Sequence, residues 1–252
     1  MAAEHDQIPE QALAWAASGE KVALATVVET WGSAPRPVGA QLAINGAAEM
    51  MGSVSGGCVE GAVVAEALEA VEDGHARVLE FGVSDDEAFA VGLACGGRIR
   101  VLVEPVGVGD GLPLALLEAL VAARAARRPV ALAVDLETWA HALVAPDGDA
   151  LSSVAGPRFL SDKSGFEGDL FLGIHNPPLR MVVVGAVHIA QPLMAMARLA
   201  GCGCRETSRP QSPTCRSETA AQRRPKAHRP RVSQARAPMS SYPRPKPPAA
   251  AP

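Results

Sequence analysis

Two cysteines lie in glycine-rich stretches of this 252-residue chain. Cys58 lies within residues 52–61, which contain four glycines, and Cys95 lies within residues 92–97, which contain three. Glycine permits positive φ and a close approach of the backbone to a ligand, and a cysteine that only fills a core requires neither. We therefore predict a ligand site around the two thiols. Two small buried cysteines are the alternative interpretation.

Cys58 directly precedes a predicted amphipathic helix that ends at Gly74. Its apolar residues recur on one face, at Val59, Val63, Ala67 and Val71. Unpaired amides at a helix start favour negative charge on a thiol and attract anionic ligands. A structural zinc site would require two more ligands, and the six histidines do not cluster near either cysteine.

The remaining patterns predict an α/β fold around these turns. Helices are expected at residues 9–17 and 112–126. Strands are expected at residues 21–28, 40–44, 77–81, 98–103, 130–134 and 141–144. Residues 29–39 are rich in Gly and Pro, and we expect an ordered loop there. Long ordered loops are often functional.

A second region begins at the linker Pro177-Pro178. A strand at 180–184, a turn at Gly185 and a helix through residue 199 have the pattern of the first βα unit of a dinucleotide-binding fold. Val187 and Ala190 occupy the places of the second and third glycines, which makes NAD(P) an unfavourable ligand. Gly185 and His188 are weak candidates for nucleotide contacts. A turn that only packs and a solvent-facing histidine are the alternatives.

Charge divides the chain into two unlike pieces. Residues 205–252 contain 11 Lys and Arg against 2 Asp and Glu, whereas residues 1–204 contain 12 against 25. The tail has ten prolines and one Val, Leu, Ile or Phe, Val232, so we expect it to be disordered. The acidic body argues against nucleic acid, and Tyr242 is the one aromatic residue of the tail that could stack on a base.

The sequence also favours a cytoplasmic protein with free thiols. It shows no secretory signal and no apolar run near the roughly 20 residues that span a bilayer. The five cysteines are odd in number and scattered, unlike a secreted disulfide framework.

Residues 26–39, 52–61 and 91–97 together resemble the N-terminal domain of the XdhC/CoxI family of xanthine dehydrogenase accessory factors. The resemblance covers residues 8–108, and residues 177–191 look like the start of that family's Rossmann domain. It implies a first domain at 1–176, a truncated Rossmann-like start at 177–204 and an out-of-frame tail at 205–252. Where the family continues with further βα units, this chain turns basic and Pro-rich, so we predict a frameshift near codons 200–205.

The resemblance implies a maturation factor rather than an enzyme. It would bind molybdenum cofactor, protect it while a cysteine desulfurase adds the sulfido ligand, and deliver it to an apo-xanthine dehydrogenase or related molybdenum hydroxylase. A homodimer is compatible with this role. The alternative is an NAD(P)-dependent oxidoreductase that uses the Gly185 turn.

The resemblance also assigns the candidate residues. Cys58 is the first choice for contacting the molybdenum or its dithiolene, and Cys95 is the second. We expect Arg36 and Ser55 to hold the anionic part of the ligand. Glycines would let the backbone approach it, at Gly56, Gly57, Gly96 and Gly97.

Overall fold

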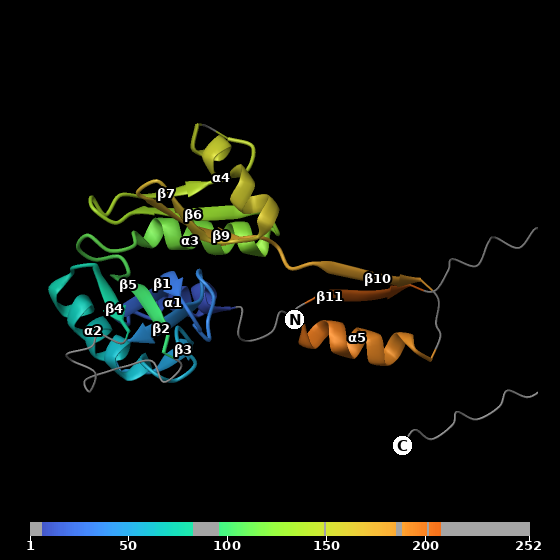
Figure 1. Cartoon of the computed structure of the whole chain (residues 1–252), viewed down its shortest axis with the longest axis horizontal. Helices are drawn as coiled ribbons and strands as arrows, with labels where there is room; N and C mark the ends of the chain where they lie inside the picture. Colours follow the sequence, from blue (N-terminus) through green and yellow to red (C-terminus); the bar gives the residue numbers. More distant parts are fainter. Residues whose placement is uncertain (1–6, 83–95, 149, 185–187, 201, 208–252) are drawn as a thin grey trace, which may run out of the picture. The chain divides into compact units, whose positions relative to one another are not determined.

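The computed structural model describes residues 7–82, 96–148, 150–184, 188–200 and 202–207. These residues form two antiparallel sheets, a short parallel strand pair and five helices (Figure 1). The predicted α/β class is confirmed. Cys95 and Gly185 lie outside the described residues.

The first sheet has the strand order β3-β2-β1-β5-β4, with antiparallel neighbours throughout. Its strands are β1 (Val22–Trp31), β2 (Gln41–Asn45), β3 (Met50–Gly52), β4 (Arg77–Phe81) and β5 (Arg98–Pro105). Alternate residues of β1 face opposite sides, as the period of a strand requires. Ala23, Ala25 and Val27 pack in one core with helix α2 (Glu60–Asp73), whereas Leu24 belongs to the core on the other face.

The second sheet has the order β7-β6-β9-β8, again antiparallel. It consists of β6 (Val130–Asp135), β7 (His141–Val144), β8 (Gly165–Glu167) and β9 (Leu170–His175). One face packs against α4 (Ala150–Ser161), through a small core that includes Val144, Ala155 and Leu172.

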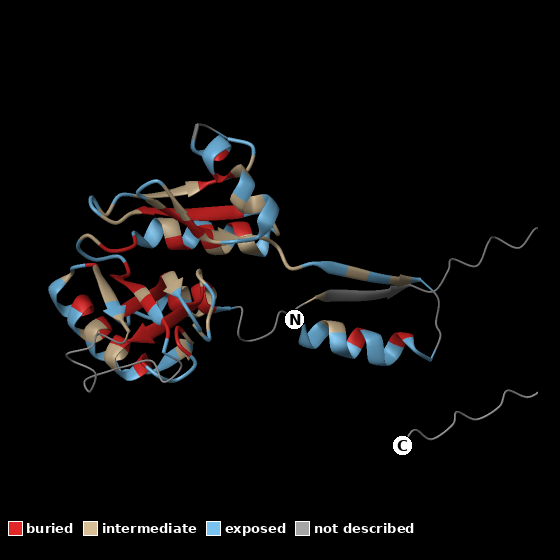
Figure 2. Cartoon of the chain, viewed as in Figure 1, coloured by how far each residue is buried: buried red, intermediate tan, exposed pale blue. Residues whose placement is uncertain are grey.

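The other face shares the largest core with the first sheet. Helices α1 (Ile8–Ala17) and α3 (Leu114–Ala125) contribute to this core, which contains Leu24 of β1, Leu117 of α3 and Phe171 of β9. Figure 2 shows these central strands as mostly buried. The core also encloses one polar link, because His141 Nε2 hydrogen-bonds Glu104 Oε1 where both side chains are almost fully buried.

A parallel βαβ unit follows the linker, made of β10 (Arg180–Val184), α5 (Ala190–Leu199) and β11 (Gly203–Thr207). The strand at 180–184 and the helix are therefore confirmed. The expectation of disorder is wrong for residues 205–207, because Gly203–Thr207 pairs with β10. This stretch has no aliphatic run, and backbone pairing with β10 is what defines it as a strand.

Apolar side chains of this unit are exposed. Val182, Ile189 and Leu199 are examples, with Leu199 86% exposed. Figure 2 shows most of α5 as exposed. No helix of the described ranges is both long and apolar enough to span a bilayer.

Candidate functional site

The loop was predicted at residues 29–39, but residues 29–31 belong to β1. Its residues 32–37 lie against both glycine-rich stretches. A methyl group added at Gly56 would lie 3.6 Å from Pro35 Cβ, and one added at Gly97 would lie 2.9 Å from the carbonyl oxygen of Ser33. The same addition at Gly32 would lie 3.5 Å from Gly97 Cα. The fold thus brings parts of the three predicted segments together, although Gly32 and Gly97 are 65 positions apart in the sequence.

The turn that carries Cys58 depends on glycine backbone geometry. Gly57 has φ +112°, which L side chains rarely adopt, and a methyl group added there would meet nothing within 4 Å. Space in front of Gly57 is therefore open. The backbone of Gly57 is therefore accessible, and its contact with a ligand stays a prediction.

Glu60, at the start of α2, holds this turn in place through hydrogen bonds to its carboxylate. Its carboxylate accepts hydrogen bonds from Ser53 Oγ at 2.6 Å, from the backbone amides of Val54, Ser55 and Gly57, and from Ser55 Oγ. Burial raises the pKa of Glu60, but the hydrogen bonds of Ser53 and Ser55 outweigh it and lower the pKa from 4.5 to about 2. The carboxylate therefore stays charged and holds the turn.

We expected Ser55 to contact the anionic part of a ligand, but its side chain is buried within the turn. It is 1% exposed, and its hydroxyl donates to Glu60 while accepting from the amides of Cys58 at 2.9 Å and Val59 at 3.0 Å. These two contacts hold the chain segment that leads into α2, although α2 itself has no side-chain cap at Val59. In this arrangement Ser55 positions the turn, and a direct contact with a ligand would require its hydroxyl to leave these partners.

Cys58 is exposed and lies two residues before the first residue of α2. Its backbone is fixed by Ser55, whereas its side chain faces solvent. The alternative of a buried packing cysteine is therefore wrong for Cys58. Cys95 lies outside the described residues, and of its neighbours Gly96 is exposed and Gly97 is buried.

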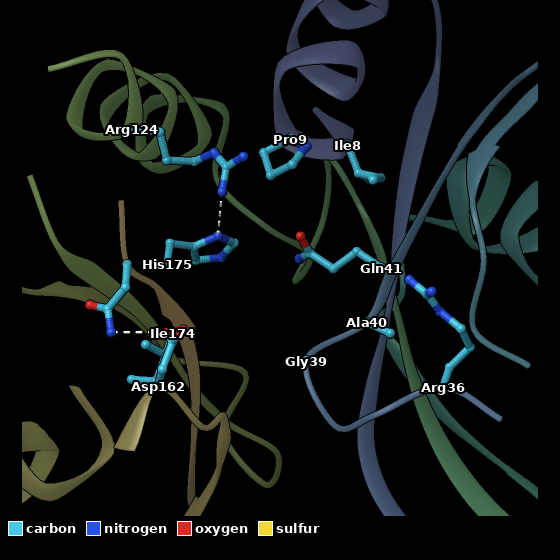
Figure 3. A pocket seen from close by; sticks show the side chains of 11 residues that line it. Ile8, Pro9, Arg36, Gly39, Ala40, Gln41, Arg124, Asp162, Ile174 and His175 are labelled. Carbon is cyan, nitrogen blue, oxygen red and sulfur yellow. Dashed lines mark hydrogen bonds between the residues drawn. The ribbon is translucent and has the colours of Figure 1, made fainter. Parts of the chain in front are cut away.

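Arg36 connects this turn to a polar pocket of about 240 Å³. Arg36 Nε donates to the carbonyl oxygen of Ser53 at 3.2 Å. In Figure 3, Arg36 and Gln41 line one side of the pocket, and Arg124 and His175 line the other. The pocket thus joins the loop of the first sheet to α3 and the end of β9.

Arg124, His175 and Gln41 were not predicted as site residues. Arg124 Nε donates to Glu10 Oε1 at 2.7 Å, and its Nη1 lies 3.1 Å from His175 Nδ1. Gln41 is buried and donates from Nε2 to Thr26 Oγ1 at 3.2 Å. No local sequence pattern could identify them, because Glu10 and Arg124 are 114 positions apart.

The remaining candidates stay predictions. His188 is exposed immediately before α5. Within the described ranges, no group of three or more His, Cys, Asp or Glu residues could hold a metal ion. If Cys58 contacts a metal, its thiolate would be one ligand, and the other ligands would come from the cofactor that carries the metal.

Residues 15–82 match the XdhC and CoxI family. The molybdenum cofactor insertion chaperone PaoD of Escherichia coli (strain K12) is 38% identical over 118 residues, which is 47% of this chain and 35% of PaoD. The uncharacterized protein YqeB of the same organism is 33% identical over 92 residues, or 36% of this chain and 17% of YqeB. The aligned region therefore spans about a third of PaoD and less of YqeB.

A solved structure gives a likeness in fold. It is described as a xanthine dehydrogenase from Bacillus halodurans, with a TM-score of 0.58 and 22% identity, over 79% of this chain and 61% of that one. The family match includes the loop at 32–37, the turn at 52–58 and Glu60. Together with the similarity to PaoD, it shows that this part of the chain is similar to the XdhC and CoxI family.

Proposed function

We propose that this chain is an accessory protein of molybdenum enzymes that binds molybdenum cofactor at the turn of Cys58. The observation that carries the proposal is an exposed thiol on a rigidly held turn, with open space at the adjacent Gly57. The similarity to PaoD supports the same role.

The residues present suit this cargo. Molybdenum cofactor has a soft metal centre, a pterin and a phosphate, and a cysteine thiolate is a suitable ligand for soft metals. Gly56 and Gly57 leave the backbone accessible, and Arg36 supplies positive charge beside the same turn. Glu60 keeps the turn in place without occupying its outer surface.

The cofactor would be delivered to a xanthine dehydrogenase or related molybdenum hydroxylase. Sulfuration by a cysteine desulfurase partner, a homodimer and a cytoplasmic location are further parts of the proposal. The family match over residues 15–82 and the similarity to PaoD support the accessory role and not these finer points. Cys95, Gly96 and Gly97 are proposed as the second wall of the site.

The test measures the affinity and stoichiometry of molybdenum cofactor binding to the purified chain. We expect Cys58→Ala to weaken binding at least tenfold, because it removes the exposed thiol without touching the hydrogen bonds of the turn. Cys202→Ala is the matched control, since Cys202 is a half-buried cysteine far along the chain from this turn. Unchanged affinity in Cys58→Ala would refute the role of the thiol.

One observation keeps the oxidoreductase alternative worth testing. The parallel β10-α5-β11 unit has the topology with which dinucleotide-binding folds begin. To test this alternative, the chain is titrated with NADH, and binding is measured from the change in NADH fluorescence. Saturable binding that is lost in a Gly185→Val variant would favour it over the chaperone role.

A further inference from the structure

The polar pocket beside Arg36 has features of a phosphate-binding site. Residues between 36 and 41, next to the first sheet, form one wall of the pocket. Residues of α3 and of the end of β9 form the opposite wall. Its walls contain two arginines, a histidine and two side-chain amides, from Arg36, Arg124, His175, Gln41 and Asn176. Such groups donate hydrogen bonds, and a guanidinium matches the geometry of a phosphate particularly well.

Arg124 is held in a fixed orientation. Glu10 on α1 accepts its Nε at 2.7 Å, and the second oxygen of Glu10 is buried without a hydrogen-bond partner among the described residues. Side-chain exposure is 16% for Arg124 and 33% for Glu10, so this pair is partly shielded from water. The guanidinium is therefore positioned before any ligand arrives.

His175 can act as a second hydrogen-bond donor in the pocket, through Nε2. A guanidinium only donates hydrogen bonds, so Nδ1 of His175 must accept from Arg124 Nη1 at 3.1 Å. Burial and the charge of Arg124 lower the pKa of His175 to about 3, so its ring is neutral near pH 7. A neutral ring that accepts at Nδ1 carries its proton on Nε2, and this N–H is available to the pocket (Figure 3).

Arg36 supplies charge from the opposite wall. Its Nε is used by the carbonyl oxygen of Ser53, and its two terminal nitrogens have no hydrogen-bond partner among the residues that the structure describes. Arg36 therefore connects the turn of Cys58 with the pocket. A ligand that spans both places could contact the thiol at one end and the pocket at the other.

Two carboxylates limit the strength of such a site. Glu10 offsets the charge of Arg124, and the exposed Asp162, which also lines the pocket, accepts a hydrogen bond from Asn176 Nδ2 at 2.9 Å. A free anion should therefore bind weakly, with a Kd on the order of 1 mM. Tight binding would require the rest of a larger ligand.

We propose that this pocket binds a phosphate monoester, with Arg36, Arg124 and His175 as donors from opposite walls. The assignment rests on the proposed function, in which the phosphate is that of molybdenum cofactor and the metal end lies at Cys58. It adds α3 and β9 to a site that the sequence placed entirely in residues 36–97.

Inorganic phosphate is the first probe, titrated against the full chain and followed by isothermal calorimetry. Arg36→Gln should weaken phosphate binding about tenfold, because it removes one charged donor pair. Arg180→Gln is the control, since Arg180 is exposed on β10 and the substitution changes the net charge equally. Equal binding by Arg36→Gln and the wild type, or equal weakening by both variants, would overturn the proposal.

Molybdenum cofactor is the second probe and separates this proposal from the proposed function. If the cofactor binds and Arg36→Gln leaves its affinity unchanged, the pocket proposal fails and the chaperone role stands. If phosphate binding depends on Arg36 and the cofactor does not bind at all, the pocket stands and the chaperone role fails. Arg124→Lys, which keeps the charge but loses the planar fork, should reduce phosphate affinity without leaving Glu10 unpaired.

Discussion

Substitution of Glu60 by Gln tests whether the buried carboxylate holds the turn of Cys58. Its pKa is about 2, against an ordinary 4.5. At 1.36 kcal/mol per pKa unit, this difference corresponds to about 3 kcal/mol of stability at neutral pH. In Glu60→Gln one oxygen remains an acceptor, but an NH₂ group replaces the other and faces Ser55 Oγ and the amide of Gly57, which both donate. We expect the full loss.

The pH dependence follows from the direction of the shift. A depressed pKa in the folded state gives stability that is complete above the unfolded value of 4.5 and is lost as the pH falls toward about 2. The wild type should therefore lose this contribution across that interval. Glu60→Gln cannot titrate there, so the difference in unfolding free energy between the two proteins should shrink as the pH falls.

Urea unfolding at several pH values between 2 and 7 measures both effects. Glu72→Gln is the matched control, because Glu72 lies on the same helix and forms an exposed ion pair with Lys21. Such exposed pairs contribute up to about 1 kcal/mol. A loss in Glu60→Gln no larger than in this control, or a difference that stays constant down to pH 2, would refute the reasoning.

Two further substitutions test how the segments are held together. Gly97→Ala would place a methyl group 2.9 Å from the Ser33 carbonyl oxygen and 3.0 Å from that of Trp31, so thermal unfolding should show a loss of about 1–3 kcal/mol. His141→Ala leaves the buried Glu104 without its partner and should cost about 3–5 kcal/mol. Replacing both His141 and Glu104 with apolar residues should restore part of that loss; no recovery would contradict the pairing argument.

Elements with strong periodicity were predictable from the sequence. The helix at Glu60–Asp73 begins just after Cys58 and ends at Gly74, which adopts the left-handed conformation expected of a helix-ending glycine. The strand Arg77–Phe81 has the predicted bounds. The helix repeats apolar residues every four positions, and the strand has Val78, Leu79 and Phe81 among its five residues.

Elements without such a pattern were missed. Helix α4 contains Gly156 and Pro157, which are unfavourable inside helices, and β3 and β8 have only three residues each. The strand β1 extends to Trp31 because a bulge between Val27 and Glu29 carries its pairing with β5 past the predicted end. Single-residue patterns do not reveal a bulge.

Only the turn around Cys58 was predictable from the sequence, and the pocket was not. Cys58 and its glycines are close in sequence, so their types and spacing indicated the turn. The role of Ser55 depends on the burial of Glu60, and the pocket depends on tertiary contacts of Arg124 with residues 51 and 114 positions away. The out-of-frame origin of residues 205–252 stays a prediction, which translation of the gene in all three forward frames would test.

The most direct test of the central claim is the rate at which Cys58 is alkylated with and without saturating molybdenum cofactor. Mass spectrometry of the labelled peptides follows Cys58 and Cys202 in the same sample. Cofactor bound at this turn should slow labelling of Cys58 at least tenfold and leave that of Cys202 unchanged. Labelling of Cys58 at the same rate in a chain shown to hold the cofactor would contradict the account.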